Sequence, residues 1–184
     1  MASDLGWRGI ECLLVEQNDQ TIGHPRANVV NARTMEFCRR WGVADAVRAA
    51  SLPADFPHTI LHVTSLTGWE LSRLERLSHG GDAPSRFSPE RQQQCNQIYF
   101  DPVMRDLAQS FEKVALRFRT KFVEFAQDGG GVTATLEEFE GGTLHTVCCA
   151  YLIDCSGGAS AIRETLGIGL EGTPVVGRSV NIFF

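Results

Sequence analysis

Residues 9–42 read GIECLLVEQNDQTIGHPRANVVNARTMEFCRRWG, and this stretch sets the fold of the chain. Its short apolar run, Cys12–Val15, ends abruptly at Glu16 and is followed by polar residues. The pattern predicts a buried parallel strand rather than a helix. In an open α/β sheet, ligands bind at the carboxyl ends of the strands, where an acidic residue can accept hydrogen bonds from a ribose diol. Glu16 lies at the carboxyl end of the predicted strand, so this stretch predicts a nucleotide-binding site.

Helices are predicted on both sides of this strand. Upstream, residues 4–8 resemble the last turn of a helix that ends at Gly9, a residue that tolerates the left-handed conformation of a helix end. Downstream, a loop containing Arg26 leads to a predicted helix from Asn31 to Arg40, which Gly42 closes. A short helical piece over 44–49 follows.

The middle of the chain changes to alternating polar and apolar residues. Residues 59–74 predict a β-hairpin that turns at Thr67-Gly68, and residues 75–94 have the polar composition of an exposed loop. Gln97 then precedes a predicted helix over 99–111, whose apolar residues recur on one face.

The last third predicts three strands in a meander, over 114–124, 132–139 and 144–155. Glycines at 129–131 and 141–142 provide the turns, and no helix follows the triplet as a phosphate-binding loop requires. The apolar end of the third strand, residues 150–155, is expected to be buried on both faces in the main sheet. A final strand is predicted over 179–184.

A loop of small residues, 156–160, lies between the third strand and a predicted helix over 161–166. Backbone N–H groups and the helix dipole at such a junction can approach a phosphate. A tight turn that needs small residues for packing explains the same composition, and the loop alone does not distinguish the two.

Composition excludes several classes of function. The 184 residues are 43% hydrophobic with a net charge of −5, which indicates a globular protein without the basic surface that nucleic acids need. No apolar run approaches the ~18 residues of a membrane span, and a cytoplasmic location is expected. The six cysteines form no CxxC pair and are expected to be reduced and buried. His58 and His62 have no further ligand at suitable spacing, so no metal site is expected.

Several motifs, in order, resemble those of the flavin-dependent aromatic hydroxylases. These single-component FAD monooxygenases are similar to para-hydroxybenzoate hydroxylase, phenol hydroxylase and the polyketide hydroxylases. The matching strings are HPRANVVNARTMEFCRRWGVADAVRAA, VTSLTGWELSRL, QQCNQ, AYLIDCSGGASAIRETLGIGLEG and the terminal GRSVNIFF. The resemblance covers essentially the whole chain.

The resemblance implies a cofactor-binding role for particular residues. Glu16 matches the acidic residue that binds the adenosine ribose of FAD, and Gln17 is its neighbour. Arg26 matches a loop arginine that reaches the pyrophosphate, and a guanidinium offers paired donors to phosphate oxygens. Gln97 matches a glutamine that contacts the ribityl and phosphate region. The loop residues Ser156 and Gly157 stand where the family has Asp-Gly.

The same resemblance implies a fold and a reaction. The fold is α/β with α+β elements: an incomplete FAD-binding Rossmann-like domain, with a β-meander and part of a substrate-domain sheet. Residues 1–57 and 95–172 would form the FAD-binding part, and 58–94 and 173–184 the substrate part. NADPH or NADH would reduce FAD, O2 would form a C4a-hydroperoxide, and an aromatic ring would be hydroxylated. No side chain is nominated as catalytic, because the cofactor carries this chemistry.

The sequence also departs from the family pattern. It lacks the first strand with its GxGxxG loop and the later Gly-Asp motif, and it has Ser156 in place of Asp. We therefore expect a fragment of such an enzyme that is inactive alone, with a non-catalytic binding or interaction protein as the alternative. A nicotinamide-dependent dehydrogenase would use Glu16 but leaves Arg26, the hairpin and Gln97 unexplained. The ring hydroxylated and the oligomeric state stay open.

Overall fold

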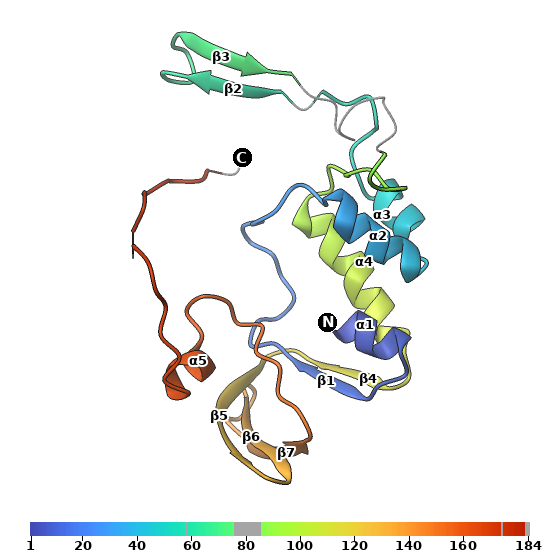
Figure 1. The fold of residues 1–184 in the computed structure, drawn as a ribbon, viewed down its shortest axis with the longest axis vertical. Helices are drawn as coiled ribbons and strands as arrows, with labels where there is room; N and C mark the ends of the chain where they lie inside the picture. Colours follow the sequence, from blue (N-terminus) through green and yellow to red (C-terminus); the bar gives the residue numbers. More distant parts are fainter. Residues whose placement is uncertain (58, 76–85, 174, 183–184) are drawn as a thin grey trace. The chain divides into compact units, whose positions relative to one another are not determined.

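The computed structural model describes residues 1–57, 59–75, 86–173 and 175–182, and it contains two compact units (Figure 1). Unit 1 comprises Met1–Leu14 and Ile22–Ala115, and unit 2 comprises Val15–Thr21 and Leu116–Phe184. Helices and strands both occur in the chain, which confirms the predicted α/β class.

Unit 1 is built around helices. They are α1 (Ala2–Trp7), α2 (Ala32–Arg40), α3 (Ala44–Ala49) and α4 (Gln97–Gln109), and α3 contacts both α2 and α4 (Figure 1). All four were predicted, although α4 begins two residues earlier than expected. The Asn31 side chain fixes the start of α2 by accepting a hydrogen bond from the Thr34 N–H at 2.8 Å.

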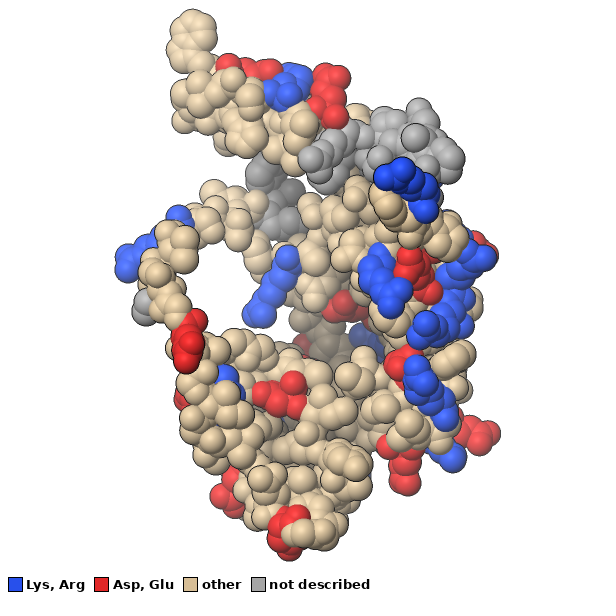
Figure 2. All heavy atoms as spheres, viewed as in Figure 1, with Lys and Arg blue, Asp and Glu red and all other residues tan. Residues whose placement is uncertain are grey.

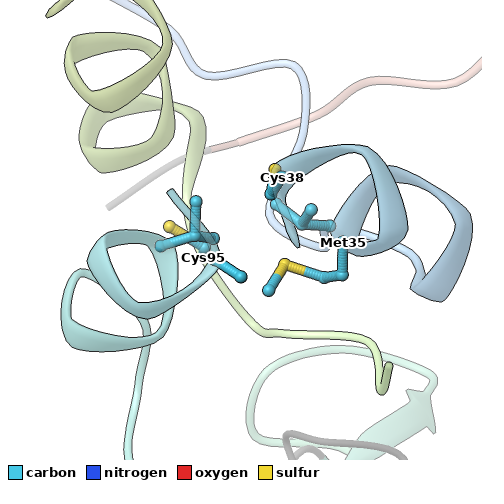
Figure 3. Packing of buried hydrophobic residues seen from close by; sticks show 6 residues of the cluster. Met35, Cys38 and Cys95 are labelled. Carbon is cyan, nitrogen blue, oxygen red and sulfur yellow. The ribbon is translucent and has the colours of Figure 1, made fainter. Parts of the chain in front are cut away.

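The core of unit 1 joins these helices to the segment that precedes α4. Met35 and Cys38 of α2 are fully buried and pack in one cluster with Cys95, which lies just before α4 (Figure 3). The other buried members are Val30, Ala44 and Val47. Phe100, Val103 and Met104 pack against this cluster from α4, as the periodicity of that helix predicts.

A buried carboxylate fastens the segment before α4 to α2 and α3. The Glu90 side chain, only 5% exposed, forms ion pairs with Arg48 of α3 and, at 3.9 Å, with Arg39 of α2. The Ser88 hydroxyl donates to Glu36 of α2 at 2.6 Å. The described part of the predicted exposed loop is therefore anchored, while residues 76–85 lie outside the described part of the chain.

The predicted hairpin is confirmed as β2 (Ile60–Val63) paired antiparallel with β3 (Glu70–Leu74). Its strands are exposed along their whole length. His62 bonds through Nδ1 to the Ser72 hydroxyl across the hairpin at 2.8 Å, whereas His58 lies outside the described residues.

The first predicted strand is confirmed as β1 (Cys12–Val15), and it pairs with β4 (Val114–Arg117). Hydrogen bonds from the Cys12 N–H to Lys113 O and from the Glu16 N–H to Arg117 O, both 2.9 Å, advance in the same direction along the two strands. The pair is therefore parallel. The expected burial of β1 is wrong, because all four residues are only half-buried in this two-stranded sheet.

Unit 2 contains the predicted meander as β5 (Thr120–Asp128), β6 (Gly131–Glu138) and β7 (Leu144–Cys149), with both pairings antiparallel. Glycine turns connect the strands as predicted. The single strand expected over 114–124 is wrong: the chain breaks before β5, where Arg119 adopts a positive φ of 51°. Its first part pairs with β1 and its second part with β6.

Two further strand predictions are wrong. Residues 150–155 and 179–182 form no strand, and residues 183–184 lie outside the described part. Tyr151 is 87% exposed where burial on both faces was expected. A strand exists only when its backbone pairs with a neighbour, and the described residues provide none for these segments.

All six cysteines are free, but the expectation that they are buried is wrong for four of them. Only Cys38 and Cys95 are buried, because they lie in the core of unit 1, while Cys148 and Cys155 are exposed. Among the described helices, none combines the length and the apolar composition of a membrane span.

Candidate functional site

Arg26 and Gln97, which are 71 positions apart in the chain, meet in unit 1. The Arg26 backbone N–H donates to the Gln97 side-chain oxygen Oε1 at 2.9 Å. The Gln97 backbone N–H in turn donates to the Ala27 carbonyl at 2.9 Å. One glutamine therefore binds two consecutive residues of the Arg26 loop.

A second contact continues this pairing along the same two segments. Val30 and Gln93 exchange two backbone hydrogen bonds, each of 2.8 Å, in an antiparallel bridge. Residues 26–30 therefore run antiparallel to residues 93–97. The burial of Val30 in the core and the anchoring of Glu90 hold the two segments in register.

The start of α4 provides the scaffold for this contact. Asn96 caps the helix, because its side-chain oxygen accepts from the Ile98 N–H at 3.0 Å. The Gln97 amide nitrogen Nε2 donates to the Asp101 carboxylate one turn later, at 3.1 Å. The sequence interpretation missed both Asn96 and Asp101; an asparagine just before a helical periodicity is the signal that identifies the cap.

Within the described residues, the Arg26 guanidinium lacks the ion pairs that several other arginines of unit 1 form. Lys and Arg side chains gather over the helices of this unit (Figure 2), where Arg33 pairs with Glu36, and Arg48 with Asp45 and Glu90. Arg26 is exposed and forms no ion pair with any described residue. Its backbone is fixed while its charge is available to an anion.

In unit 2, Glu16 lies directly after β1. Its backbone N–H bonds to Arg117 O at 2.9 Å, and its carbonyl accepts from the Thr120 N–H at 3.0 Å. Its carboxylate oxygen Oε1 accepts from both the backbone N–H and the side-chain amide of Asn18, at 2.8 and 2.7 Å. The other oxygen, Oε2, accepts no hydrogen bond from the described residues. The neighbouring Gln17 is exposed.

Ser156 and Gly157 belong to a loop that a carboxylate organises. Asp154 accepts from the Ser156 backbone N–H at 2.8 Å, from the Ser156 hydroxyl at 2.6 Å, and from the hydroxyl of Ser160. These hydrogen bonds, with those from Ser156 the largest cause, hold the pKa of Asp154 below its ordinary value. Gly157 has a φ of +93°, a conformation that favours glycine.

The helix that follows this loop is short. Ser160 is buried and caps α5 (Ala161–Thr165) by accepting from the Arg163 N–H at 2.9 Å. The predicted helix is thus confirmed, and its cap is itself bound to Asp154. The described contacts fit the tight-turn interpretation of the loop, since its polar side chains bind one another.

Comparison with known proteins shows the family of this chain. A family model described as "FAD binding domain" matches residues 1–184. The chain belongs to this FAD-binding domain family. Its relatives include a putative polyketide hydroxylase of Streptomyces halstedii, 37% identical over 180 residues, and a 4-methyl-5-nitrocatechol 5-monooxygenase of a Burkholderia species, 33% identical over 177 residues. The two alignments cover 98% and 96% of this chain and 32% of each relative. The chain therefore spans about a third of the length of the curated relatives it matches.

Solved structures of similar fold include a flavin-dependent monooxygenase and an enzyme with bound reduced flavin. The flavin-dependent monooxygenase PieE, solved with FAD and substrate, is 31% identical with a TM-score of 0.80, covering 94% of this chain and 30% of that protein. RebC with bound 7-carboxy-K252c is 34% identical with a TM-score of 0.80, covering 90% of this chain and 31% of that protein. The predicted resemblance to flavin-dependent monooxygenases is confirmed.

Proposed function

We propose that this chain provides FAD-binding residues of a monooxygenase that hydroxylates an aromatic substrate with NADPH or NADH and O2. The observation that carries the proposal is the Arg26 loop, whose backbone is held by Gln97 while the guanidinium stays exposed. A fixed arginine without an internal ion pair suits a pyrophosphate, because the guanidinium donates in pairs to phosphate oxygens.

We assign the candidate residues to separate parts of FAD. Arg26 would bind the pyrophosphate. Gln97 would reach the ribityl and phosphate region with the second hydrogen of Nε2, since only one is used by Asp101. Glu16 would accept from the adenosine ribose through Oε2, with Gln17 beside it. Ser156 and Gly157 would contribute backbone N–H groups to a phosphate of the cofactor.

When bound, FAD would supply the redox chemistry for ring hydroxylation with NADPH or NADH and O2. The chain itself supplies binding and orientation. Residues 1–57 and 95–172 would serve the cofactor, and 58–94 and 173–184 would serve the substrate. The names of the relatives, which include a putative polyketide hydroxylase and a 2,4-dichlorophenol 6-monooxygenase, support an aromatic substrate.

The test is a titration of the isotopically labelled chain with FAD, followed by amide NMR shifts so that weak binding is detected. We expect shifts at Glu16, Arg26 and Gln97. Riboflavin, which lacks both the pyrophosphate and the adenosine, should leave Arg26 unshifted. Arg26→Ala should weaken FAD binding roughly tenfold, the effect of losing a charge-assisted hydrogen bond, whereas the charge-matched Arg178→Ala should not. Shifts scattered over the surface, with equal effects of both variants, would reject the proposal.

A non-catalytic binding protein is the second candidate, and Ser156 favours it. The resemblance implies Asp at this position, whereas here the serine side chain is bound to Asp154. The two candidates differ in turnover: oxidation of NADPH or NADH that depends on added FAD and a phenol supports the enzyme. FAD binding without such oxidation supports the binding protein.

A further inference from the structure

We infer that Asp101 and Gln97 act together as positioning residues for Arg26, with Asp101 setting the orientation of the Gln97 amide. The inference rests on the proposed function only where it assigns a pyrophosphate to Arg26. The hydrogen bonds on which it is built stand independently of any ligand.

Two hydrogen bonds attach the Arg26 loop to the start of α4. The Gln97 side chain accepts from the Arg26 N–H, and the Gln97 main chain donates to the Ala27 carbonyl, each at 2.9 Å. Two bonds to consecutive residues fix both the position and the direction of the peptide between them. A single bond would let this peptide rotate.

Asp101 makes the first bond specific. An amide side chain has nearly the same shape in its two orientations, but only one presents the oxygen to the Arg26 N–H. The reverse orientation would bring the amide donors against that N–H. The Asp101 carboxylate, 3.1 Å from Gln97 Nε2, offers acceptors only and therefore selects the productive orientation.

The arrangement fixes the backbone of Arg26 and leaves its guanidinium available to bind an anion. The guanidinium forms no ion pair within the described part of the chain, so no internal acid competes with a bound anion. A backbone that is already ordered loses less conformational freedom when the anion binds. The Gln97–Asp101 pair should therefore raise the affinity of Arg26 for a pyrophosphate by ordering its backbone, in addition to any direct contact that Gln97 Nε2 makes with the cofactor.

Exchanging the two groups tests this mechanism. The double variant Gln97→Glu/Asp101→Asn keeps an acceptor for the Arg26 N–H and reverses the donor and acceptor between positions 97 and 101, with no change in net charge. Gln97→Glu alone sets two carboxylates against each other, and Gln97→Met removes the acceptor. Gln109→Met, on the exposed end of the same helix, is the matched control.

Two quantities are measured on the 184-residue chain. One is the hydrogen-exchange rate of the Arg26 amide, and the other is the dissociation constant for inorganic pyrophosphate from amide shifts. Gln97→Met and Gln97→Glu should each speed exchange and weaken pyrophosphate binding about tenfold, the effect of one lost hydrogen bond. The double variant should restore both quantities, and Gln109→Met should change neither.

The outcomes separate this inference from the proposed function. A double variant no better than Gln97→Glu, or binding that is unaffected while exchange changes, overturns the inference. A wild-type chain that shows no pyrophosphate-dependent shift at Arg26 overturns the assignment of Arg26 in the proposed function. In that event, the exchange rates still decide whether Gln97 and Asp101 hold the Arg26 backbone.

Discussion

At the scale of single residues, burial divides the cysteine thiols into two groups. Burial raises the pKa of Cys38 to about 11, and it raises the pKa of Cys95 as well. Since the thiolate is the reactive form, we expect both to resist a thiol reagent at pH 8 while the exposed Cys148 and Cys155 react at once. Timed labelling followed by mass spectrometry gives the order in which the cysteines react. Unfolding the chain in denaturant should make Cys38 and Cys95 react as fast as the others. Labelling of Cys38 as fast as Cys148 in the folded chain would contradict its burial.

Asp154 is expected to make the loop before α5 sensitive to acid. Because its folded pKa lies below the ordinary 3.8, the stabilisation is complete above pH ~3.8 and is lost as the pH falls through the lowered folded value. Protonation removes an acceptor from Ser156 and Ser160. We expect the Ser156 amide resonance to shift only in this acidic range, and Asp154→Asn to abolish the transition. A Ser156 shift centred near neutral pH would point to another group.

At the scale of elements, the cap of α2 should contribute measurably to stability. Asn31→Ala removes the acceptor for the Thr34 N–H and should lower the free energy of unfolding by about 1 kcal/mol. Asn31→Asp retains an acceptor for the Thr34 N–H and should preserve most of the free energy of unfolding. Urea unfolding followed by helix circular dichroism measures both variants. Equal losses for the two would show that the hydrogen bond does not matter.

The helices could be predicted from sequence because their signals are local. Asn31 and Gly42 lie next to the two ends of α2, close to the residues whose structure they signal. The apolar repeat of α4 likewise lies within the helix that it predicts. Strands depend on partners elsewhere in the chain. Residues 150–155 have the composition of a buried strand but find no pairing neighbour among the described residues, so composition alone misled.

The candidate site shows the same division. Glu16 was identifiable because it directly follows a strand, and Arg26 and Gln97 because they stand in motifs that resemble a family. That the Arg26 N–H bonds to Gln97 could not be predicted from spacing, since 71 positions separate the two residues. Asp101 became visible only through its contact with Gln97.

At the scale of the whole molecule, each compact unit has its own buried residues. Met35 is fully buried in unit 1, and Leu136, 3% exposed, is buried in unit 2. Met35→Ala should destabilise unit 1 by about 2–5 kcal/mol through lost burial and a cavity. Leu136→Ala should do the same in unit 2. Hydrogen exchange resolved by residue should show faster exchange in α2 and α4 for the first variant and in β5–β7 for the second. Loss of protection throughout the chain in both variants would instead mean that the units unfold together.

The bridge between Val30 and Gln93 also bears on how the chain can vary. It closes the segment that contains α2, α3 and the β2–β3 hairpin, and it holds the two ends of that segment together. Lengthening a closed loop is cheap, about 0.6 kcal/mol for each doubling. Insertions, deletions or a transplanted hairpin can therefore be absorbed in the exposed β2–β3 part of this segment while Arg26 stays bound to Gln97 at the start of α4. The hairpin proposed to face the substrate can therefore change without moving the residues proposed to hold the cofactor.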